Sequence, residues 1–215
     1  PDELQGLVDV LAKYPDIVVM SDDVYEHINF GAELRSLASF PELKDRVVII
    51  NGVSKAYAMT GWRIGYCAAP AALAKAVTKL QGQYTSGASS IAQKAAEAAY
   101  DGPQECVGEM RAAFLRRRDL VVSLAREIPG LKVNEPEGAF YLFPEVSAFI
   151  GRHAGDRTIA SSGDLALYLL EEAHVATVDG AAFCAPGYIR LSYATSDDNI
   201  RESMRRIATA LAKLQ

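Results

Sequence analysis

The sequence predicts an α/β domain followed by a smaller α+β domain. Two short apolar runs, DIVVMSDD from Asp16 and RVVIINGVSK from Arg46, each end in polar residues, which is typical of parallel strands buried on both faces of a sheet. Roughly twenty residues separate the runs, enough for the crossover of a βαβ unit. After Pro129 the pattern changes to short strands and turns with helices between them, which is typical of an α+β fold.

The segment before the first run predicts an amphipathic helix, which Pro15 closes. Its apolar side chains occupy the i, i+3, i+4 and i+7 positions of one helical face: Leu4, Leu7, Val8 and Leu11. The expected crossover carries its own apolar residues: Leu34, Leu37, Phe40 and Leu43. Residues 63–70, RIGYCAAP, predict a third strand.

Helices are expected in the middle of the chain. Residues 71–101 are rich in alanine and predict two helices, interrupted by a Gly/Ser/Thr-rich stretch at residues 85–90. Pro103 opens a longer segment in which apolar residues recur at helical spacing up to Pro129, which predicts one long helix. The three arginines at residues 116–118 are expected to form a solvated stripe of that helix, without a function.

The last part of the chain predicts a helix around residues 162–174, two strand-like runs, VATVDGAAF and YIRLSYA, and a closing helix. Ser196 is the expected cap of the closing helix. The apolar stripe of this helix comprises Ile200, Met204, Ile207, Leu211 and Leu214. We therefore expect a first domain over residues 1–102, a linking helix over 103–128 and a small C-terminal domain over 129–215.

Composition excludes several classes of protein. The 215 residues include 22 basic and 27 acidic side chains, a net charge of -5, and the basic residues are spread along the chain, so nucleic acid is not an expected partner. No apolar run reaches the roughly 18 residues that cross a bilayer, so we expect a cytoplasmic protein without membrane contact.

Cysteine and histidine spacing indicates no metal site. Cys67, Cys106 and Cys184 are odd in number and far apart, and we expect them to be buried free thiols. The histidines share no ligand spacing with one another or with the cysteines, so we expect them to be structural.

Polar residues follow both predicted strands. Asp22 and Tyr25 come at the end of the first and Lys55 at the end of the second, so parallel strands bring them to the carboxyl edge of the sheet, where α/β folds bind ligands. A lysine whose pKa is lowered by desolvation or a nearby cation becomes a Schiff-base nucleophile, and Arg63 is a candidate for that cation. Taken singly, Asp22 can be a turn cap, Tyr25 a core residue and Lys55 a solvated strand end.

Four segments, SDDVYEHI, NGVSKAYAMTGWRIGY, PEGAFYLFP and APGYIRLSYA, resemble in this order the motifs of class I pyridoxal-phosphate aminotransferases, the aspartate aminotransferase group of fold type I. The resemblance extends over nearly the whole chain. It implies the PLP-transferase fold type I, with a partial large domain built on a mostly parallel sheet flanked by helices. It also implies pyridoxal 5′-phosphate as cofactor, and transamination of aspartate or a related dicarboxylic or aromatic amino acid to a 2-oxo acid.

The resemblance implies roles for the residues at the sheet edge. Asp22 corresponds to the aspartate that pairs with the pyridine nitrogen of the cofactor, and Tyr25 to the tyrosine that meets its phenolic oxygen. Lys55 corresponds to the lysine that forms the internal aldimine and, once displaced, moves the proton. Ser54 and Arg63 correspond to phosphate-binding positions.

Two further segments acquire roles by resemblance. Arg190 corresponds to the arginine that binds the substrate α-carboxylate, although it can also be an exposed strand arginine. Residues 85–90 resemble the segment that reaches the site of a neighbouring subunit, which implies a homodimer. Residues 138–140 resemble a turn that places an aromatic ring near the substrate, and Phe140 can equally be a core residue.

Family members are longer, and this chain resembles their downstream half. We therefore expect the complete protein to be the enzyme, and these residues alone to be inactive and to bind the cofactor weakly or not at all, with an unpaired strand edge and an exposed apolar face. Cys184 stands where the family more often has glycine. Two alternatives remain open: another fold-type-I reaction such as β-elimination, and a non-catalytic regulatory module that binds the same cofactor.

Overall fold

A computed structural model describes residues 2–31 and 34–215 of the protein. The chain forms two compact units, Pro1–Arg111 and Ala112–Gln215. The boundary between them falls inside the longest helix, α4 (Glu105–Arg126). Each unit has its own sheet, so the two are described separately.

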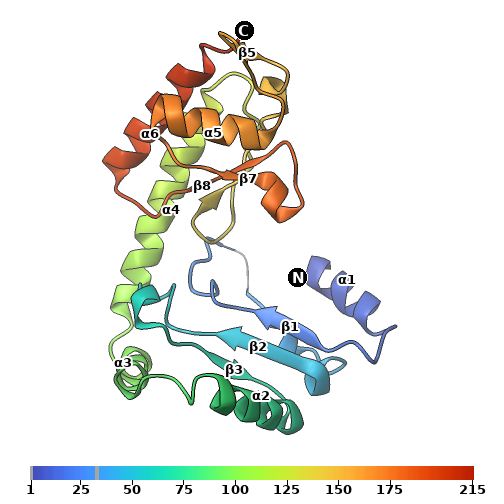
Figure 1. Cartoon of the computed structure of the whole chain (residues 1–215). Helices are drawn as coiled ribbons and strands as arrows, with labels where there is room; N and C mark the ends of the chain where they lie inside the picture. The colour runs from blue at the N-terminus through green and yellow to red at the C-terminus, as the bar shows by residue number, and fades with distance from the viewer. Residues whose placement is uncertain (1, 32–33) are drawn as a thin grey trace. The chain divides into compact units, whose positions relative to one another are not determined.

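The first unit contains a three-stranded sheet in the order β1-β2-β3 (Figure 1). Its strands are β1 (Val19–Asp22), β2 (Val47–Asn51) and β3 (Tyr66–Ala68). As predicted, β1 and β2 are parallel, and Asp22 lies opposite Ile50. Strand β3 runs antiparallel to β2, with Tyr66 opposite Asn51. The carboxyl ends of β1 and β2 therefore lie at the same edge of the sheet.

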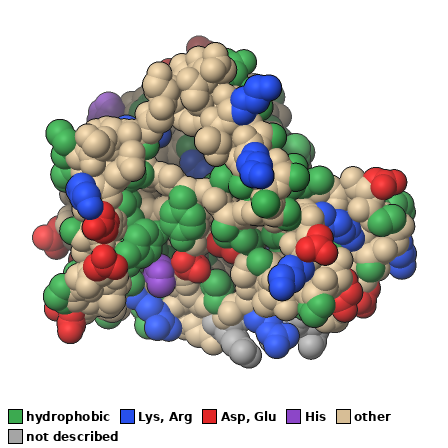
Figure 2. Space-filling view, turned by 90° about the horizontal axis from the view of Figure 1, so that it is seen from below, with side chains coloured by type: hydrophobic (Ala, Val, Ile, Leu, Met, Phe, Trp, Pro, Cys, Tyr) green, Lys and Arg blue, Asp and Glu red, His purple; other side chains and the backbone are tan. Residues whose placement is uncertain are grey.

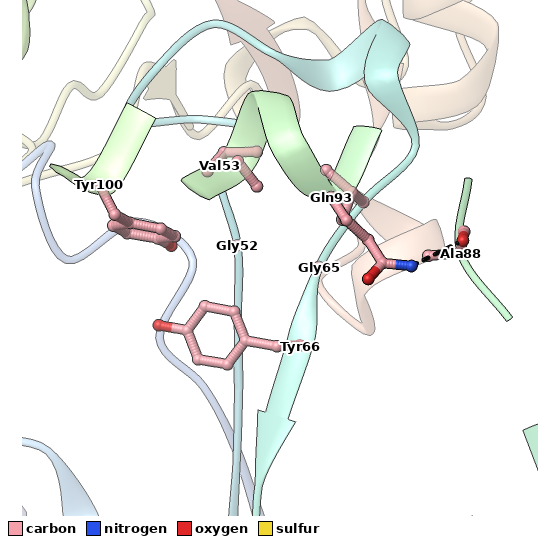
Figure 3. A pocket seen from close by; sticks show the side chains of 9 residues that line it. Gly52, Val53, Gly65, Tyr66, Ala88, Gln93 and Tyr100 are labelled. Carbon is pink, nitrogen blue, oxygen red and sulfur yellow. Dashed lines mark hydrogen bonds between the residues drawn. The ribbon is translucent and has the colours of Figure 1, made fainter. Parts of the chain in front are cut away.

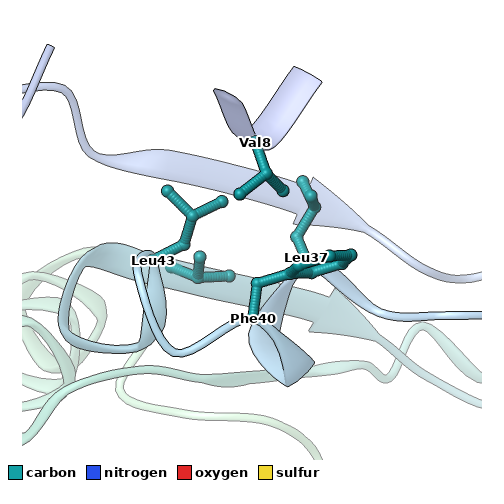
Figure 4. Packing of buried hydrophobic residues seen from close by; sticks show 5 residues of the cluster. Val8, Leu37, Phe40 and Leu43 are labelled. Carbon is teal, nitrogen blue, oxygen red and sulfur yellow. The ribbon is translucent and has the colours of Figure 1, made fainter. Parts of the chain in front are cut away.

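Helices form where the apolar spacing predicts them. They are α1 (Asp2–Leu11), α2 (Ala71–Tyr84), α3 (Ser90–Asp101) and α4. Helix α2 ends directly before the predicted Gly/Ser/Thr-rich stretch, and α3 begins at the end of it, as expected. Figure 4 shows how Val8 of α1 meets the apolar residues of the crossover, and the buried cluster consists of Val8, Leu37, Phe40, Leu43 and Val47. This cluster joins α1 to the sheet.

The crossover between β1 and β2 differs from the expected βαβ unit. Its described residues form two short 3₁₀ helices, η1 (Leu37–Ser39) and η2 (Lys44–Arg46), and no α-helix. Pro41 explains this difference, since proline lacks an N–H donor and disfavours helical backbone in the residue before it. Leu37, Phe40 and Leu43 still bury their side chains, whereas Leu34 is 50% exposed. The connection therefore covers the sheet without a regular helix.

The expectation that the first strand is buried on both faces is wrong. Residues along β1 alternate between half-buried and exposed, and Met20 is 73% exposed, since nothing in the described part of the chain covers its face of the strand. Helices α2 and α3 also expose apolar side chains, among them Val77, Leu80, Tyr84 and Ile91. Hydrophobic side chains likewise reach the surface among charged ones on the face drawn in Figure 2.

The second unit contains an antiparallel sheet in the order β4-β8-β7 and a separate hairpin. The sheet strands are β4 (Tyr141–Leu142), β7 (Val178–Asp179) and β8 (Ile189–Ser192), and the hairpin strands are β5 (His153–Ala154) and β6 (Arg157–Thr158). The unit also has two short 3₁₀ helices. One, η4 (Ser147–Phe149), precedes the hairpin, and the other, η5 (Gly180–Phe183), follows β7.

Two helices, α5 (Ser162–Ala173) and α6 (Asp197–Leu211), complete this unit, and both were predicted. The Ser196 side chain caps α6 by accepting a hydrogen bond from the Asn199 N–H. The predicted apolar stripe of α6 is buried. Beyond α6, the backbone groups of Gln215 and His153 exchange two hydrogen bonds of 2.9 and 3.0 Å, which attaches the last described residue to the hairpin.

The arginines at residues 116–118 are not a simple solvated stripe. Arg116 and Arg117 both donate to the carboxylate of Asp197 at the start of α6. The Arg118 side chain is only 12% exposed and donates to the backbone oxygen of Pro136. The expectation is therefore wrong for Arg118, which links α4 to the segment before β4.

The cysteines are free, as expected, but the expectation that they are buried is wrong. Cys106 and Cys184 are exposed and Cys67 is half-buried. Cys184 has a φ of 57°, in the left-handed region that favours glycine. This backbone conformation gives a physical reason why glycine suits the position.

Arg46 connects α1 to the sheet through backbone carbonyls. Its guanidinium donates to the oxygens of Leu11, Tyr14 and Ile17 at 2.7, 2.9 and 2.7 Å. We expect Arg46→Ala to lower the free energy of unfolding by about 1–3 kcal/mol, since the substitution removes three charge-assisted hydrogen bonds. Thermal unfolding measures the effect, and Lys44→Ala on the exposed surface next to it is the control. Equal melting temperatures for the two variants would contradict this role.

Candidate active site

Two consecutive aspartates end the first strand and have different environments. The Asp23 carboxylate accepts hydrogen bonds from the hydroxyls of Ser21 and Ser36 at 2.7 and 2.8 Å, and its N–H donates to Ile50 across the sheet. The Asp22 carboxylate is exposed and accepts a longer bond of 3.3 Å from the Val24 N–H. Asp23 thus stabilises the turn, and Asp22 presents its carboxylate to solvent at the edge of the sheet.

Tyr25 and Lys55 meet at this edge. Tyr25 lies in the turn after β1 and Lys55 in the turn after β2, and both are half-buried. The Lys55 Nζ lies 5.6 Å from the centroid of the Tyr25 ring, within the range of a cation–π contact. The structure therefore brings these two predicted residues together, next to the strand that ends at Asp22.

A partly buried hydrogen bond joins the two turns. Asn51, at the end of β2, is 8% exposed, and its Nδ2 donates to the Glu26 Oε1 at 2.6 Å. The Asn51 Oδ1 accepts from the Gly52 N–H at 2.7 Å. Because the amide side chain of Asn51 is shielded from water, these bonds restrain the turns more strongly than surface bonds would. The sequence analysis assigned no role to Glu26 or Asn51.

Ser54 and Arg63 belong to one closed loop. The Thr60 hydroxyl donates to the Ser54 backbone oxygen at 3.0 Å, and the Arg63 Nη1 donates to the Thr60 backbone oxygen at 2.9 Å. The loop contains the 3₁₀ helix η3 (Thr60–Trp62), and Arg63 follows it with a φ of 53°. The Arg63 side chain is exposed and retains further N–H donors for a ligand.

The glycines at the start of this loop and of β3 lie against each other. A Cβ atom on Gly52 would stand 2.9 Å from the Gly65 Cα, and one on Gly65 would stand 3.0 Å from the Asn51 backbone oxygen. The close approach sets the direction in which the chain leaves β2 towards Lys55.

A mainly apolar cavity of about 300 Å³ lies beside these glycines. Figure 3 shows the rings of Tyr66 and Tyr100 at this cavity, near Gly52 and Gly65. Burial, followed by a hydrogen bond with Tyr66, raises the pKa of Tyr100 above its ordinary value. Of the residues predicted to bind cofactor or substrate, none lines the cavity, although Ala88 of the 85–90 segment does. It is therefore a different feature from the edge with Lys55.

Arg190 lies on β8 in the second unit, apart in the chain from the other predicted site residues. Its guanidinium carbon lies 4.4 Å from the centroid of the Tyr141 ring and 4.5 Å from that of the Phe183 ring. Phe140, for which two roles were open, stacks on Phe114 at 5.3 Å. The aromatic residue of this segment that contacts Arg190 is the next one along the chain, Tyr141.

The sequence analysis missed Tyr141 and Phe183. The available signal was the alternation of residues along short strands, which places Tyr141 on the same face as Arg190 once β4 and β8 are paired. In the described part of the chain, no group of three or more His, Cys, Asp or Glu side chains can hold a metal ion. Among those same residues, no helix is both long and apolar enough to cross a membrane.

Comparison with known proteins gives consistent matches. The sequence profile of the family described as Aminotransferase class I and II matches residues 1–207. An aspartate/prephenate aminotransferase of Nitrosomonas europaea is 48% identical over 215 residues, covering 98% of this chain and 54% of that protein.

Solved structures agree with the sequence matches. The aspartate aminotransferase of Rhizobium meliloti superposes with a TM-score of 0.94 at 44% identity, over 98% of this chain and 54% of that one. The aromatic aminotransferase of Pyrococcus horikoshii superposes with a TM-score of 0.89 at 35% identity, over 98% of this chain and 55% of that one. The predicted fold class is confirmed. The chain spans about half the length of the curated relatives that it matches.

The Gly52–Gly65 approach is testable by substitution. We expect Gly52→Ala to lower stability by about 1–3 kcal/mol, because the added methyl group would meet backbone atoms that cannot move aside. Gly61→Ala is the control, since a Cβ there has open space around it. Thermal unfolding of both variants gives the comparison. A Gly52→Ala protein as stable as Gly61→Ala would contradict the prediction, because it would show that the backbone segments at Gly52 and Gly65 can move apart without loss of stability.

Proposed function

The chain belongs to the family of class I and II aminotransferases, and we propose that the complete protein transfers the amino group of an amino acid to a 2-oxo acid. The observation that carries the proposal is the meeting of Lys55 and Tyr25 where β1 and β2 end side by side. An amine beside an aromatic ring, at the carboxyl edge of a parallel pair, suits covalent chemistry on a carbonyl compound.

Pyridoxal 5′-phosphate is the cofactor that we propose, and the residues at this edge have the chemistry to hold it. Asp22 offers an exposed carboxylate for the ring nitrogen and Lys55 an amine for the carbonyl group. The loop of Ser54 and Arg63 offers a hydroxyl and N–H donors for the phosphate. Tyr25 offers its hydroxyl to the phenolic oxygen.

When bound, this cofactor supplies a carbonyl carbon that condenses with amines and a ring that withdraws the electrons left on a deprotonated Cα. Asp22 favours the protonated form of the ring nitrogen through its negative charge. Tyr25 orients the ring by a hydrogen bond from its hydroxyl group. Lys55, as a free amine, would accept the proton from the substrate Cα and donate it to the carbon that was the carbonyl carbon of the cofactor.

Arg190 is the proposed binding residue for the substrate α-carboxylate, since a guanidinium can donate two parallel hydrogen bonds to a carboxylate. The relatives named aspartate/prephenate aminotransferase and aspartate aminotransferase support aspartate or a related dicarboxylic or aromatic amino acid as the amino donor. The 2-oxo acid is the matching acceptor.

The proposal includes the domain boundaries and the assembly of the complete protein. Residues 1–102 form part of a large cofactor-binding domain, 103–128 the linking helix and 129–215 the small domain. The protein is a cytoplasmic homodimer, in which the segment between α2 and α3 reaches the site of the second subunit. The exposed apolar side chains of α2 and of β1 support an assembly that covers more surface than this chain covers by itself.

Lys55 provides the main test. In the complete protein supplied with pyridoxal 5′-phosphate, we expect Lys55→Ala to lower the rate of 2-oxo acid formation by at least about a thousandfold, because the proton at Cα loses its carrier. Lys79→Ala, an exposed lysine of α2, is the control and keeps the rate. Circular dichroism checks that both variants fold. A Lys55→Ala protein with more than about a tenth of the original rate would exclude this role.

Product analysis separates transamination from the alternatives. We expect aspartate and 2-oxoglutarate to yield equal amounts of a new amino acid and a new 2-oxo acid, since the amino group is conserved. In a parallel sample with serine, whose β-hydroxyl can leave as water, released ammonia together with pyruvate would instead indicate β-elimination. Cofactor binding without any product would indicate a regulatory module. Chromatography of the products and an ammonia assay on each sample give the answer.

A further inference from the structure

We infer that Tyr141 and Phe183 are positioning residues, which hold the guanidinium of Arg190 in one plane so that it binds a substrate carboxylate along its edge. The inference rests on the proposed function for the nature of the ligand. It concerns residues of the second unit alone, and it assigns to two aromatic side chains a role that the sequence analysis did not give them.

The two rings reach Arg190 from opposite sides of its strand. In the sheet order β4-β8-β7, β8 lies between the strand that carries Tyr141 and the strand that leads into η5 with Phe183. Tyr141 is paired with Ser192, two residues from Arg190 on the same face of β8. The guanidinium carbon lies 4.4 and 4.5 Å from the two ring centroids, well inside the range of a cation–π contact.

The rings themselves are supported by further contacts. The ring centroid of Tyr141 lies 4.7 Å from that of Phe140, and the Phe140 ring in turn stacks on Phe114 of α4. On the other side, the Asp179 carboxylate caps η5 by accepting from the Ala181 N–H, and Phe183 packs on Phe143 at 6.1 Å. A ring that is supported from behind restrains the cation more than a freely rotating side chain does.

The chain leads Phe183 into place through a tight turn. A Cβ on Gly180 would stand 2.3 Å from the Ala185 backbone oxygen, so only glycine fits where η5 begins. Cys184, in the left-handed region, ends the same turn directly after Phe183. Both ends of η5 are thus determined by local backbone requirements, which places the Phe183 ring reproducibly.

The N–H donors of Arg190 are not used within the unit. Among the described residues, Arg190 forms no hydrogen bond or ion pair, although its side chain is half-buried. Both ring centroids lie within 4.5 Å of the guanidinium carbon, so the rings cover part of the guanidinium. A carboxylate that approaches in the plane of the guanidinium can accept two parallel hydrogen bonds. The aromatic cover also excludes water from the faces, which strengthens the ionic contact.

Substitution in the complete protein tests the inference. We expect Phe183→Leu and Tyr141→Leu each to raise the KM for the amino donor about tenfold, because the guanidinium loses one supporting face, while kcat changes by less than about twofold. Tyr141→Phe, which keeps the ring, recovers most of the affinity lost in Tyr141→Leu. Phe149→Leu is the matched control, since its ring lies against a different arginine of the same unit, with the Arg152 guanidinium carbon 5.4 Å from the ring centroid.

Calorimetry with succinate, a dicarboxylate that has no amino group to transfer, measures carboxylate binding independently of turnover. Weaker succinate binding in Phe183→Leu and Tyr141→Leu than in Phe149→Leu supports the positioning role, even if the wild-type protein proves unable to transaminate and the proposed function fails. Unchanged KM and unchanged succinate affinity in an active enzyme would overturn the positioning role alone. A loss of kcat with unchanged KM would also overturn it.

Discussion

The parallel pairing of β1 and β2 is the constraint on which the candidate site depends. It places the turn with Tyr25 and the turn with Lys55 at one edge of the sheet, although about thirty residues separate them in the chain. Two local features keep the turns in register: the partly buried hydrogen bond from Asn51 to Glu26, and the close approach of Gly52 to Gly65.

Much of the fold could be predicted because helices and strand ends are local features. Apolar spacing identified α1, α4 and α6, and the end of each apolar run located the parallel strands. The crossover was harder, because Pro41 breaks the helix that its length suggested. The burial of β1 could not be judged from its apolar run, since exposure depends on what covers the strand, as Met20 demonstrates.

The candidate site was predictable in part for the same reason. Tyr25 and Lys55 follow strands directly, so the end of each strand indicates their place. Tyr141 and Phe183 come close to Arg190 only through the order of strands in the second sheet, and no local pattern encodes that order. Arg118 illustrates the converse difficulty, since its charge suggested solvent while the structure places it against the backbone oxygen of Pro136.

The junction of Gln215 with His153 has a consequence for how this end of the second unit tolerates sequence change. Both contacts run through the main chain, so the identity of the side chain at position 215 is of little importance to them. Removing the residue would be a different matter, because the hairpin would lose a donor and an acceptor at once. That position therefore requires main-chain groups and makes little demand on the side chain.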